Sequence, residues 1–325
     1  MNYLAAQTNV MPQSLFKKEM LLMGNQFEIS AVAGDEEWAY ERIDEAVAEI
    51  KRIETILTTY KDYSETNLIN RNAGINPVKV SKEVFHLIER SIRISDLTQG
   101  SFDITYGSID KSLWNFDKNM KSLPDQRRAK KMVRLINYRN IILDQDKQTV
   151  FLKEKGMRIG FGGIGKGYAA EMAKSVMKKN GVTSGIVNAS GDLTAWGNQP
   201  NGLPWTIGIA HPDAAHMPFS YMNITDMAVA TSGNYEKYVV INKKKYSHTI
   251  NPRTGFPVRG IKSVTIIAPN AELCDALATP VTIMGINAGL HLINQLKQVE
   301  CIIIDDDNKL YMSRNIHLSW ANLFV

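Results

Sequence analysis

The spacing of apolar side chains near the N-terminus predicts a strand followed by an amphipathic helix. From Gln26 to Ala33 apolar and polar residues alternate, as in a strand with one buried face. The next apolar residues recur every three to four positions, which places them on one face of a helix. They are Ile43, Val47, Ile50, Ile53 and Leu57. A strand that leads into a helix is therefore the expected opening unit.

Helix and turn signals continue through the first half of the chain. A second helix is expected from about Ser81, a suitable N-cap residue, to Gln99, where Gly100 supplies the stop. Two short apolar runs, residues 141–143 and 149–152, flank a polar turn and predict a β-hairpin.

The second half of the chain consists mainly of strand signals with helices between them. The glycine-rich residues 160–167 open a helix that is expected to run to about Asn180. The other expected elements are strands at 185–188, 205–210, 227–230 and 263–268, hairpins at 238–250 and 302–312, and helices at 271–284 and 288–298. Because the strands occur in runs and do not alternate strictly with helices, we expect an α+β fold with mostly antiparallel sheets and packed helices.

Composition and charge narrow the class of protein. Of the 325 residues, 44% are hydrophobic and 22% are charged, as in soluble globular proteins, and the length allows one elaborate domain or two ordinary ones. The net charge is +5, but the basic residues are scattered in short groups, so we expect no nucleic-acid partner and only a mild positive field that attracts phosphates. Cys274 and Cys301 fall within apolar elements and are expected to be buried thiols.

Targeting signals are not evident in the sequence as it stands. The N-terminal residues lack a basic region followed by a long apolar run, and no stretch approaches the length of a transmembrane segment. We therefore expect a cytoplasmic protein without a transmembrane segment. If a leader has been removed, the expected location is exported or periplasmic.

Residues 160–167, GFGGIGKG, form a candidate phosphate-binding loop. They contain the dinucleotide pattern G-x-G-x-x-G, but the next expected strand ends in Val187 and Asn188, without the carboxylate that holds a ribose. They nearly spell a P-loop, but Gly167 replaces the magnesium-binding Ser or Thr. What remains is a set of backbone N–H groups at a helix N-terminus, which suits a phosphate or pyrophosphate. The alternative is that the glycines only form a tight turn.

Asp275 and Thr279 are four residues apart in an expected helix, so they lie on one face, one turn from each other. Two oxygen ligands on adjacent turns suit a hard cation such as magnesium. The alternative is an acidic residue that interacts with the helix dipole beside a threonine that bonds back to its own backbone. The spacing alone is compatible with both.

Two further segments carry polar groups suited to catalysis or ligand binding. His248 falls at the end of an expected strand, before a turn built on Pro252 and Gly255. A histidine in this position is suited to act as a base near neutral pH, although an isolated histidine is more often structural. Residues 230–235, ATSGNY, offer hydroxyls and a glycine that suit an adenine or a phosphate, or an ordinary turn.

Taken together and in order, these stretches resemble the ApbE family of FAD:protein FMN transferases. The resemblance covers residues from about 20 to 300 and rests on a series of ordered blocks. The blocks are MGNQFEIS at Met23, LTTYKDYSETNLIN at Leu57, TQGSFDITYGSIDKSLWNF at Thr98, GGIGKGYAAE at Gly162, IVNASGDLTAWG at Ile186, ATSGNYEKY at Ala230, YSHTINPRTGFPV at Tyr246 and CDALATPVTIMG at Cys274. The resemblance implies an ApbE-like fold with a single transferase domain over residues 20–320, after an irregular N-terminal segment, residues 1–19.

The resemblance also implies a reaction and a site. An enzyme of this family uses magnesium and FAD, transfers FMN through its phosphate to a Thr or Ser of an acceptor flavoprotein, and releases AMP. Such acceptors include subunits of Na⁺-translocating and related electron-transfer complexes. The magnesium ligands of the family match Asp275, Thr279 and a backbone carbonyl, that of Gly163, and His248 matches the residue that assists deprotonation of the incoming hydroxyl. The blocks that line the FAD site contribute Met23, Tyr60, Lys166, Glu171, Thr231, Ser232, Gly233 and Tyr235.

The chain departs from the family pattern at two positions, and two other functions remain open. Asn234 and Asn251 stand where Asp is common, which removes two negative charges but no expected ligand. The first alternative is an FAD pyrophosphatase that produces FMN and AMP with water as the acceptor. The second is a flavin-binding protein without catalytic activity.

Overall fold

A computed structural model describes residues 12–110, 122–211, 214–233, 238–241, 244–316 and 319–320. Its main element is an eight-stranded sheet in which every neighbouring pair is antiparallel. In spatial order the strands are β1 (Ser14–Leu22), β2 (Asn25–Ala33), β6 (Gly185–Ala189), β7 (Asp192–Trp196), β10 (Ala228–Gly233), β13 (Ile261–Ala268), β14 (Glu300–Asp305) and β15 (Leu310–Met312). The sheet thus joins strands from both ends of the chain, and the expected α+β fold is confirmed.

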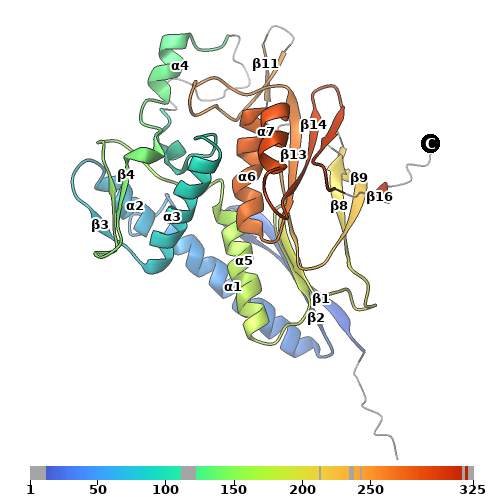
Figure 1. Ribbon diagram of the computed structural model, residues 1–325. Coiled ribbons are helices and arrows are strands. Elements are labelled where there is room, and N and C mark those ends of the chain that lie inside the picture. The colour runs from blue at the N-terminus through green and yellow to red at the C-terminus, as the bar shows by residue number, and fades with distance from the viewer. Residues whose placement is uncertain are drawn as a thin grey trace, which may run out of the picture.

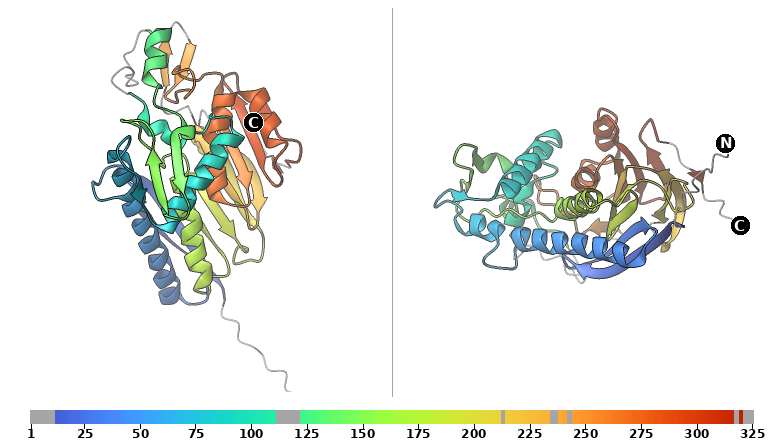
Figure 2. Two further views of the ribbon diagram at one scale, coloured as in Figure 1. Left: turned by 60° about the vertical axis from the view of Figure 1, so that its left-hand side comes forward. Right: turned by 90° about the horizontal axis from the view of Figure 1, so that it is seen from below.

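Helices cover one face of this sheet. They are α1 (Glu36–Leu57), α5 (Gly165–Lys179), α6 (Ala271–Met284) and the short α7 (Ile286–Ile293). Figure 2 shows α1 and α5 side by side along the sheet, and α5 also packs against α6. The apolar faces of the three long helices and the sheet residues beneath them form the largest hydrophobic core. The first turn of α5 lies against α6, because Gly167 is in close contact with Ala271.

A smaller sheet covers the other face. It contains β8 (Trp205–His211), β9 (Ala214–Ile224) and β16 (Ser319–Trp320) in the order β16-β9-β8. Side chains of both sheets form a second core that includes Trp205, Val229 and Ile267. Because β13 lies in the middle of the large sheet and is covered on both faces, all of its residues are buried.

A second group of elements lies beside the sheet (Figure 1). It contains α2 (Glu65–Arg71), α3 (Lys82–Leu97), α4 (Gln126–Met132), the short 3₁₀ helices η1 (Ile104–Ser108) and η2 (Tyr138–Asn140), and a sheet of β3 (Val78–Lys79), β4 (Ile141–Asp144) and β5 (Thr149–Leu152). The hairpin of β11 (Tyr238–Ile241) and β12 (Lys244–Ser247) packs against α4 through a third core. A bidentate ion pair links this group to the helical layer, because Arg90 of α3 donates to both carboxylate oxygens of Glu272 at 2.6 and 3.0 Å.

The structure corrects one boundary. Residues 1–19 were expected to be irregular, but β1 begins at Ser14 and pairs with β2 from Ser14↔Ala33 to Leu22↔Asn25. The strand is at the edge of the sheet and most of its side chains are exposed, so the sequence lacks a clear alternation there. Within the described part of the chain, no helix combines the length and the apolar character needed to cross a membrane.

Candidate functional site

The glycine loop is fixed at its N-terminal side by buried hydrogen bonds. The side-chain amide of Asn70 on α2 accepts from the backbone N–H of Ile159 at 2.7 Å and donates to the carbonyl of the same residue at 3.0 Å. The N–H of Gly160 donates to the carbonyl of Ile104 at 3.0 Å. Residues 157–160 belong to no strand, so the loop lacks the strand that precedes a Rossmann or P-loop turn. Both motifs are thereby excluded on geometry as well as on sequence.

Segments far apart in the sequence surround this loop. A β-carbon at Gly160 would lie 3.9 Å from the methyl group of Thr59, and one at Gly165 would lie 3.8 Å from the terminal methyl of Met23. The aromatic ring of Phe102 is similarly close to Gly163, at 3.5 Å. The turn that carries Met23 and the segment that carries Thr59 therefore meet at the glycine loop, as the expected site requires.

Tyr60, the residue after Thr59, is one of the most exposed aromatic residues of the described chain. Its relative exposure is 95%, and its backbone N–H donates to the hydroxyl of Thr58 at 3.2 Å. The backbone is therefore held while the ring remains free to stack on a planar ligand. Its position next to the loop agrees with the sequence expectation, and its contact with flavin stays a prediction.

Asp275 is buried on α6, and its side chain reaches α5. Its carboxylate accepts from the backbone N–H of Gly167 at 3.0 Å, a contact between residues 108 positions apart. Burial, followed by repulsion from Asp192, raises the pKa of Asp275 to about 7. The carboxylate thus lies at the end of α5 where backbone N–H groups are unpaired by the helix itself. An interaction with the dipole of α6 alone does not account for this orientation.

Gly167 is what allows this contact. A β-carbon at this position would lie 2.1 Å from the carbonyl oxygen of Ala271 and 2.8 Å from the β-carbon of Asp275. Any other residue would force the two helices apart. The residue that breaks the P-loop pattern therefore has a structural reason of its own.

Thr279 lies one turn beyond Asp275 on the same face and is half-buried. Threonine hydroxyls within helices often bond to the carbonyl four residues back, as Thr282 does here to Ala278 at 3.1 Å. The described hydrogen bonds include no such bond from Thr279 to Asp275. The back-bonded alternative is thus not adopted, and the hydroxyl is open to a ligand.

Asp192 is a site residue that sequence reasoning missed. It begins β7, after a tight turn at Ser190 and Gly191, and its carboxylate forms an ion pair with the ammonium group of Lys166. The side chains of the two partners are 5% and 27% exposed, respectively. Burial raises the pKa of Asp192 above its ordinary value, although the positive charge of Lys166 opposes this shift. The sequence does contain a carboxylate four residues after Asn188, but it gives no sign that this residue lies beside the glycine loop. Asp192 reaches Lys166 because β7 turns back antiparallel to β6.

Lys166 therefore faces two carboxylates. Burial lowers the pKa of its ammonium group, but attraction to Asp192 and then to Asp275 outweighs this effect, so the pKa lies above its ordinary value. Lysine remains charged and balances part of the negative charge of the site. Its assigned role as an FAD-binding residue stays a prediction, since its ammonium group is already engaged by Asp192.

Thr231 on β10 lies beside Asp192. β10 pairs with β7 at Ala228↔Thr194 and Val229↔Leu193, and the backbone of Thr231 lowers the pKa of Asp192, which places this segment beside the carboxylate. The hydroxyl of Thr231 lies 2.9 Å from that of Thr265 on β13. Ser232 and Gly233 follow on the same strand and are half-buried. Tyr235 and the departure at Asn234 lie outside the described residues.

Glu171 has a well-defined structural task. One oxygen of its carboxylate accepts from the backbone N–H of Ala271 at 2.8 Å, at the N-terminus of α6, and the other lies 3.6 Å from the ammonium of Lys174. The side chain is 14% exposed. Glu171, one turn after Gly167 on α5, therefore holds the N-terminus of α6 against α5. Its expected contribution to FAD binding stays a prediction.

His248 directly follows β12, whose hairpin packs against α4, and it is exposed. Its neighbours are fixed: the N–H of Ser247 donates to the carbonyl of Val258 at 3.0 Å, and the N–H of Ile250 donates to the hydroxyl of Tyr106 at 3.2 Å. In the turn that follows, the side chain of Asn251 accepts from the N–H of Arg253 at 2.9 Å. Asn thus makes the turn contact that an Asp at this position would make.

The residues expected to bind magnesium carry the kind of ligand atoms that this ion prefers. No group of three or more His, Cys, Asp or Glu side chains suited to a metal occurs among the described residues, which argues against a zinc-type site in that part of the chain. A carboxylate, the open hydroxyl of Thr279 and the carbonyl of Gly163 are oxygen donors, and magnesium takes such donors together with phosphate oxygens and water. The raised pKa of Asp275 indicates a buried carboxylate that a cation would stabilise.

Comparisons with known proteins agree with this architecture. The ApbE family model matches residues 23–303. The FAD:protein FMN transferase of Klebsiella pneumoniae is 28% identical over 311 residues, which cover 95% of each chain. That of Treponema pallidum is 27% identical over 289 residues, which cover 84% of this chain and 80% of that protein.

Solved structures show the same fold. The ApbE protein of Thermotoga maritima has a TM-score of 0.82 and 27% sequence identity, and the match covers 92% of this chain and 97% of that one. The flavinyl transferase ApbE of Pseudomonas stutzeri has a TM-score of 0.79 at 22% identity, with 97% and 96% covered, which supports the fold. The family match over most of the sequence, together with this shared architecture, establishes that the chain belongs to the ApbE family.

Proposed function

We propose that the protein transfers the FMN half of FAD to a Thr or Ser hydroxyl of an acceptor flavoprotein, in a magnesium-dependent reaction that releases AMP. The names of its relatives support transfer of FMN from FAD to a protein. The observation that carries the proposal is the hydrogen bond between Asp275 and the N–H of Gly167. It joins a buried carboxylate to the backbone N–H groups that suit a pyrophosphate.

In this proposal the glycine loop and the first turn of α5 bind the pyrophosphate of FAD through backbone N–H groups. Met23 and the exposed ring of Tyr60 offer an apolar and an aromatic surface for the flavin. Asp275, Thr279 and the carbonyl of Gly163 would hold the magnesium ion. Bound there, magnesium supplies positive charge that offsets the charge of the phosphate oxygens.

The chemistry is an attack by the acceptor hydroxyl on the FMN phosphorus. A bond forms between the hydroxyl oxygen and this phosphorus, and the bond between phosphorus and the bridging oxygen of the pyrophosphate breaks, so that AMP departs with that oxygen. The proton of the hydroxyl moves to the imidazole of His248, which stands exposed on a fixed turn. The ion pair of Lys166 and Asp192 is fixed close enough to Asp275 for its charges to act on that carboxylate.

The test incubates the protein with FAD, magnesium chloride and a flavoprotein acceptor domain, and follows the mass of the acceptor. We expect an FMN adduct that requires the target Thr or Ser and is lost on chelation of magnesium. His248→Ala should abolish transfer while FAD binding, measured by flavin fluorescence, persists. His86→Ala is the matched control, because His86 is an exposed histidine on α3, away from the glycine loop in sequence.

The alternatives give different results. Release of FMN and AMP without an adduct, across several acceptor domains, would identify an FAD pyrophosphatase and refute the transferase proposal. Stoichiometric FAD binding without turnover would identify a flavin-binding protein. Full activity of His248→Ala would remove the histidine from the mechanism.

A further inference from the structure

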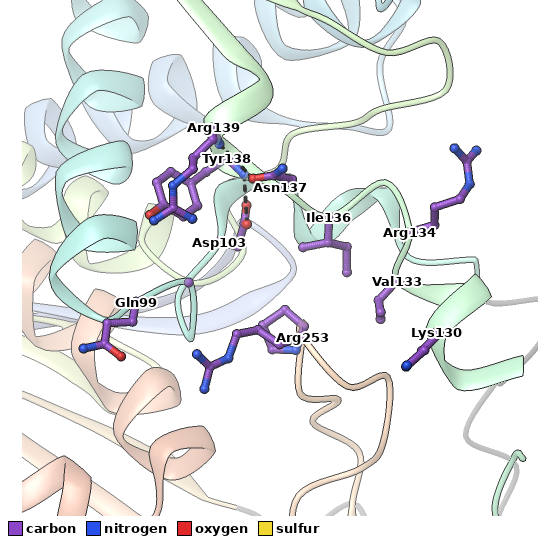
Figure 3. A pocket seen from close by; sticks show the side chains of 12 residues that line it. Gln99, Asp103, Lys130, Val133, Arg134, Ile136, Asn137, Tyr138, Arg139 and Arg253 are labelled. Atoms are coloured by element: carbon purple, nitrogen blue, oxygen red, sulfur yellow. Dashed lines mark hydrogen bonds between the residues drawn. The ribbon is translucent and has the colours of Figure 1, made fainter. Parts of the chain in front are cut away.

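A cavity lies between α4 and the turn that follows His248. Its volume is about 300 Å³. Three segments form its walls: residues 99–103, residues 130–139 and the pair Pro252 and Arg253. Figure 3 shows this hollow with its lining side chains. None of the residues assigned above to magnesium or FAD lines it.

The lining carries a surplus of positive charge. Four cationic side chains contribute to it, namely Lys130, Arg134, Arg139 and Arg253. In Figure 3 Arg139, Arg253 and Lys130 extend from separate segments around the hollow, and Arg134 points away from Arg253. Arg134 is partly neutralised by Glu154, whose carboxylate lies 3.6 Å away. Within the described part of the chain, neither Lys130 nor Arg253 forms a salt bridge.

The one carboxylate in the lining, Asp103, interacts electrostatically with Arg139 and so offsets only part of this positive charge. Asp103 is buried, and its first oxygen accepts from the N–H of Thr105 at 2.8 Å and from its hydroxyl at 2.6 Å. Its second oxygen accepts from the N–H of Tyr138 at 3.0 Å. Burial outweighs the opposing effect of these hydrogen bonds and raises the pKa of Asp103 above its ordinary value. The Asp103 carboxylate thus links the segment at Thr105 to the segment at Tyr138.

The walls that carry the arginines are rigid. The guanidinium group of Arg139 stacks on the ring of Tyr138 at 4.6 Å, and the Tyr138 hydroxyl donates to Asp96 at 2.7 Å. On the opposite wall, Gly255 has φ +74°, and a β-carbon there would lie 2.1 Å from the carbonyl oxygen of Ala129 on α4. The turn that bears Arg253 is therefore packed tightly against α4, so the cavity exists before any ligand binds.

We propose that this cavity is a binding site for a phosphate dianion, either free phosphate or the phosphate group of a small monoester such as a nucleoside monophosphate. Guanidinium groups offer paired N–H donors that match phosphate oxygens, and here Arg139 and Arg253 border one cavity, with Lys130, in which Asp103 is the one carboxylate of the lining. The size of the cavity is at the lower end for small-molecule sites, which suits a compact anion. The inference is independent of the proposed transfer reaction, because it rests on other residues.

The test measures binding of inorganic phosphate and of AMP, separately, by isothermal titration calorimetry in magnesium-free buffer. The variant Arg139→Gln/Arg253→Gln should bind the same anion more weakly by on the order of tenfold or more, because two charge-assisted contacts are lost. The matched control is Arg127→Gln/Arg128→Gln, which removes the same charge from exposed positions of α4 outside the lining. The control should retain the affinity of the unmodified protein.

The two ligands identify the source of the phosphate. Binding of inorganic phosphate that is lost in the double variant supports a free-phosphate site. Binding of AMP but not of phosphate, again lost in the double variant, supports a nucleotide site. Absence of binding of either ligand at millimolar concentration overturns the proposal. Equal affinity in the Arg139→Gln/Arg253→Gln variant also overturns it, since the anion would then bind elsewhere. If that double variant unfolds, the single variant Arg253→Gln, at an exposed turn position, is measured in its place. Weaker anion binding then supports the proposal, and unchanged affinity overturns it.

Discussion

A single methyl group added at Gly167 should separate the two helices on which the site is built. In the structure a β-carbon at this position would lie 2.1 Å from the carbonyl oxygen of Ala271 and 2.8 Å from the β-carbon of Asp275. Both obstacles belong to the backbone or to its first side-chain atom, so rotation of a flexible side chain cannot relieve the clash. In Gly167→Ala, α6 must therefore move away from α5 by about 1 Å to restore ordinary contact distances.

The cost has two parts. Overpacking of a well-packed interior costs about 1–3 kcal/mol, and the upper end applies here because the obstacle is backbone. The displacement also weakens the hydrogen bond from the Gly167 N–H to Asp275, and a bond to a charged group contributes about 1.5–3 kcal/mol. Together these give a loss of roughly 3–5 kcal/mol. For a domain of this size, we expect Tm to fall by about 6–10 °C, at the low end of the shift per kcal/mol.

The matched control is Gly162→Ala in the same loop. A β-carbon at Gly162 meets nothing within 4 Å. We expect its effect on stability to stay within about 0.5 kcal/mol. Both variants are to be measured by thermal unfolding and by magnesium titration, since movement of α6 also carries Asp275 and Thr279 away from the carbonyl of Gly163. Magnesium affinity should fall in Gly167→Ala.

Equal Tm values for Gly167→Ala and Gly162→Ala would refute the reasoning. Such a result would mean that the two helices accommodate the methyl group without separating. A lowered Tm with unchanged magnesium affinity would retain the packing argument but remove its link to the metal ligands.

Two further predictions concern the charges at the same site. Burial and then Asp192 raise the pKa of Asp275 to about 7, so protons should compete below that pH with the magnesium ion that we propose binds there. The magnesium affinity measured by calorimetry should then fall by up to about tenfold per pH unit between about pH 7 and pH 5, and a constant affinity would contradict the proposal. Asp275→Asn should remove this pH dependence. Lys166→Met should cost about 3–5 kcal/mol in urea unfolding, because it leaves the buried Asp192 carboxylate without its partner, and Asp192→Asn should cost less, because Lys166 keeps its attraction to Asp275. The double variant should cost less than their sum by about 1–3 kcal/mol, whereas strict additivity would show that the ion pair is not coupled.

Local patterns in the sequence determined most of the helices. The helix expected at 271–284 has those bounds in the structure, where Asn270 caps its N-terminus, and Ser81 caps α3 as expected. Such features depend on hydrogen bonds between residues three to four positions apart, so they can be read from a short stretch of sequence. The edge strand β1 was missed because its mostly exposed side chains carry no alternating apolar pattern.

The contacts that build the candidate site are visible only in the tertiary structure. The spacing of Asp275 and Thr279 was compatible with a metal site and with an ordinary helix, and the sequence contained no sign of a partner for Asp192. The contact of Asp275 with Gly167 joins residues 108 positions apart, and that of Lys166 with Asp192 depends on how β6 turns back into β7. The physical reason is that burial and charge pairing arise when distant segments exclude water together, and no periodicity within one segment encodes that contact.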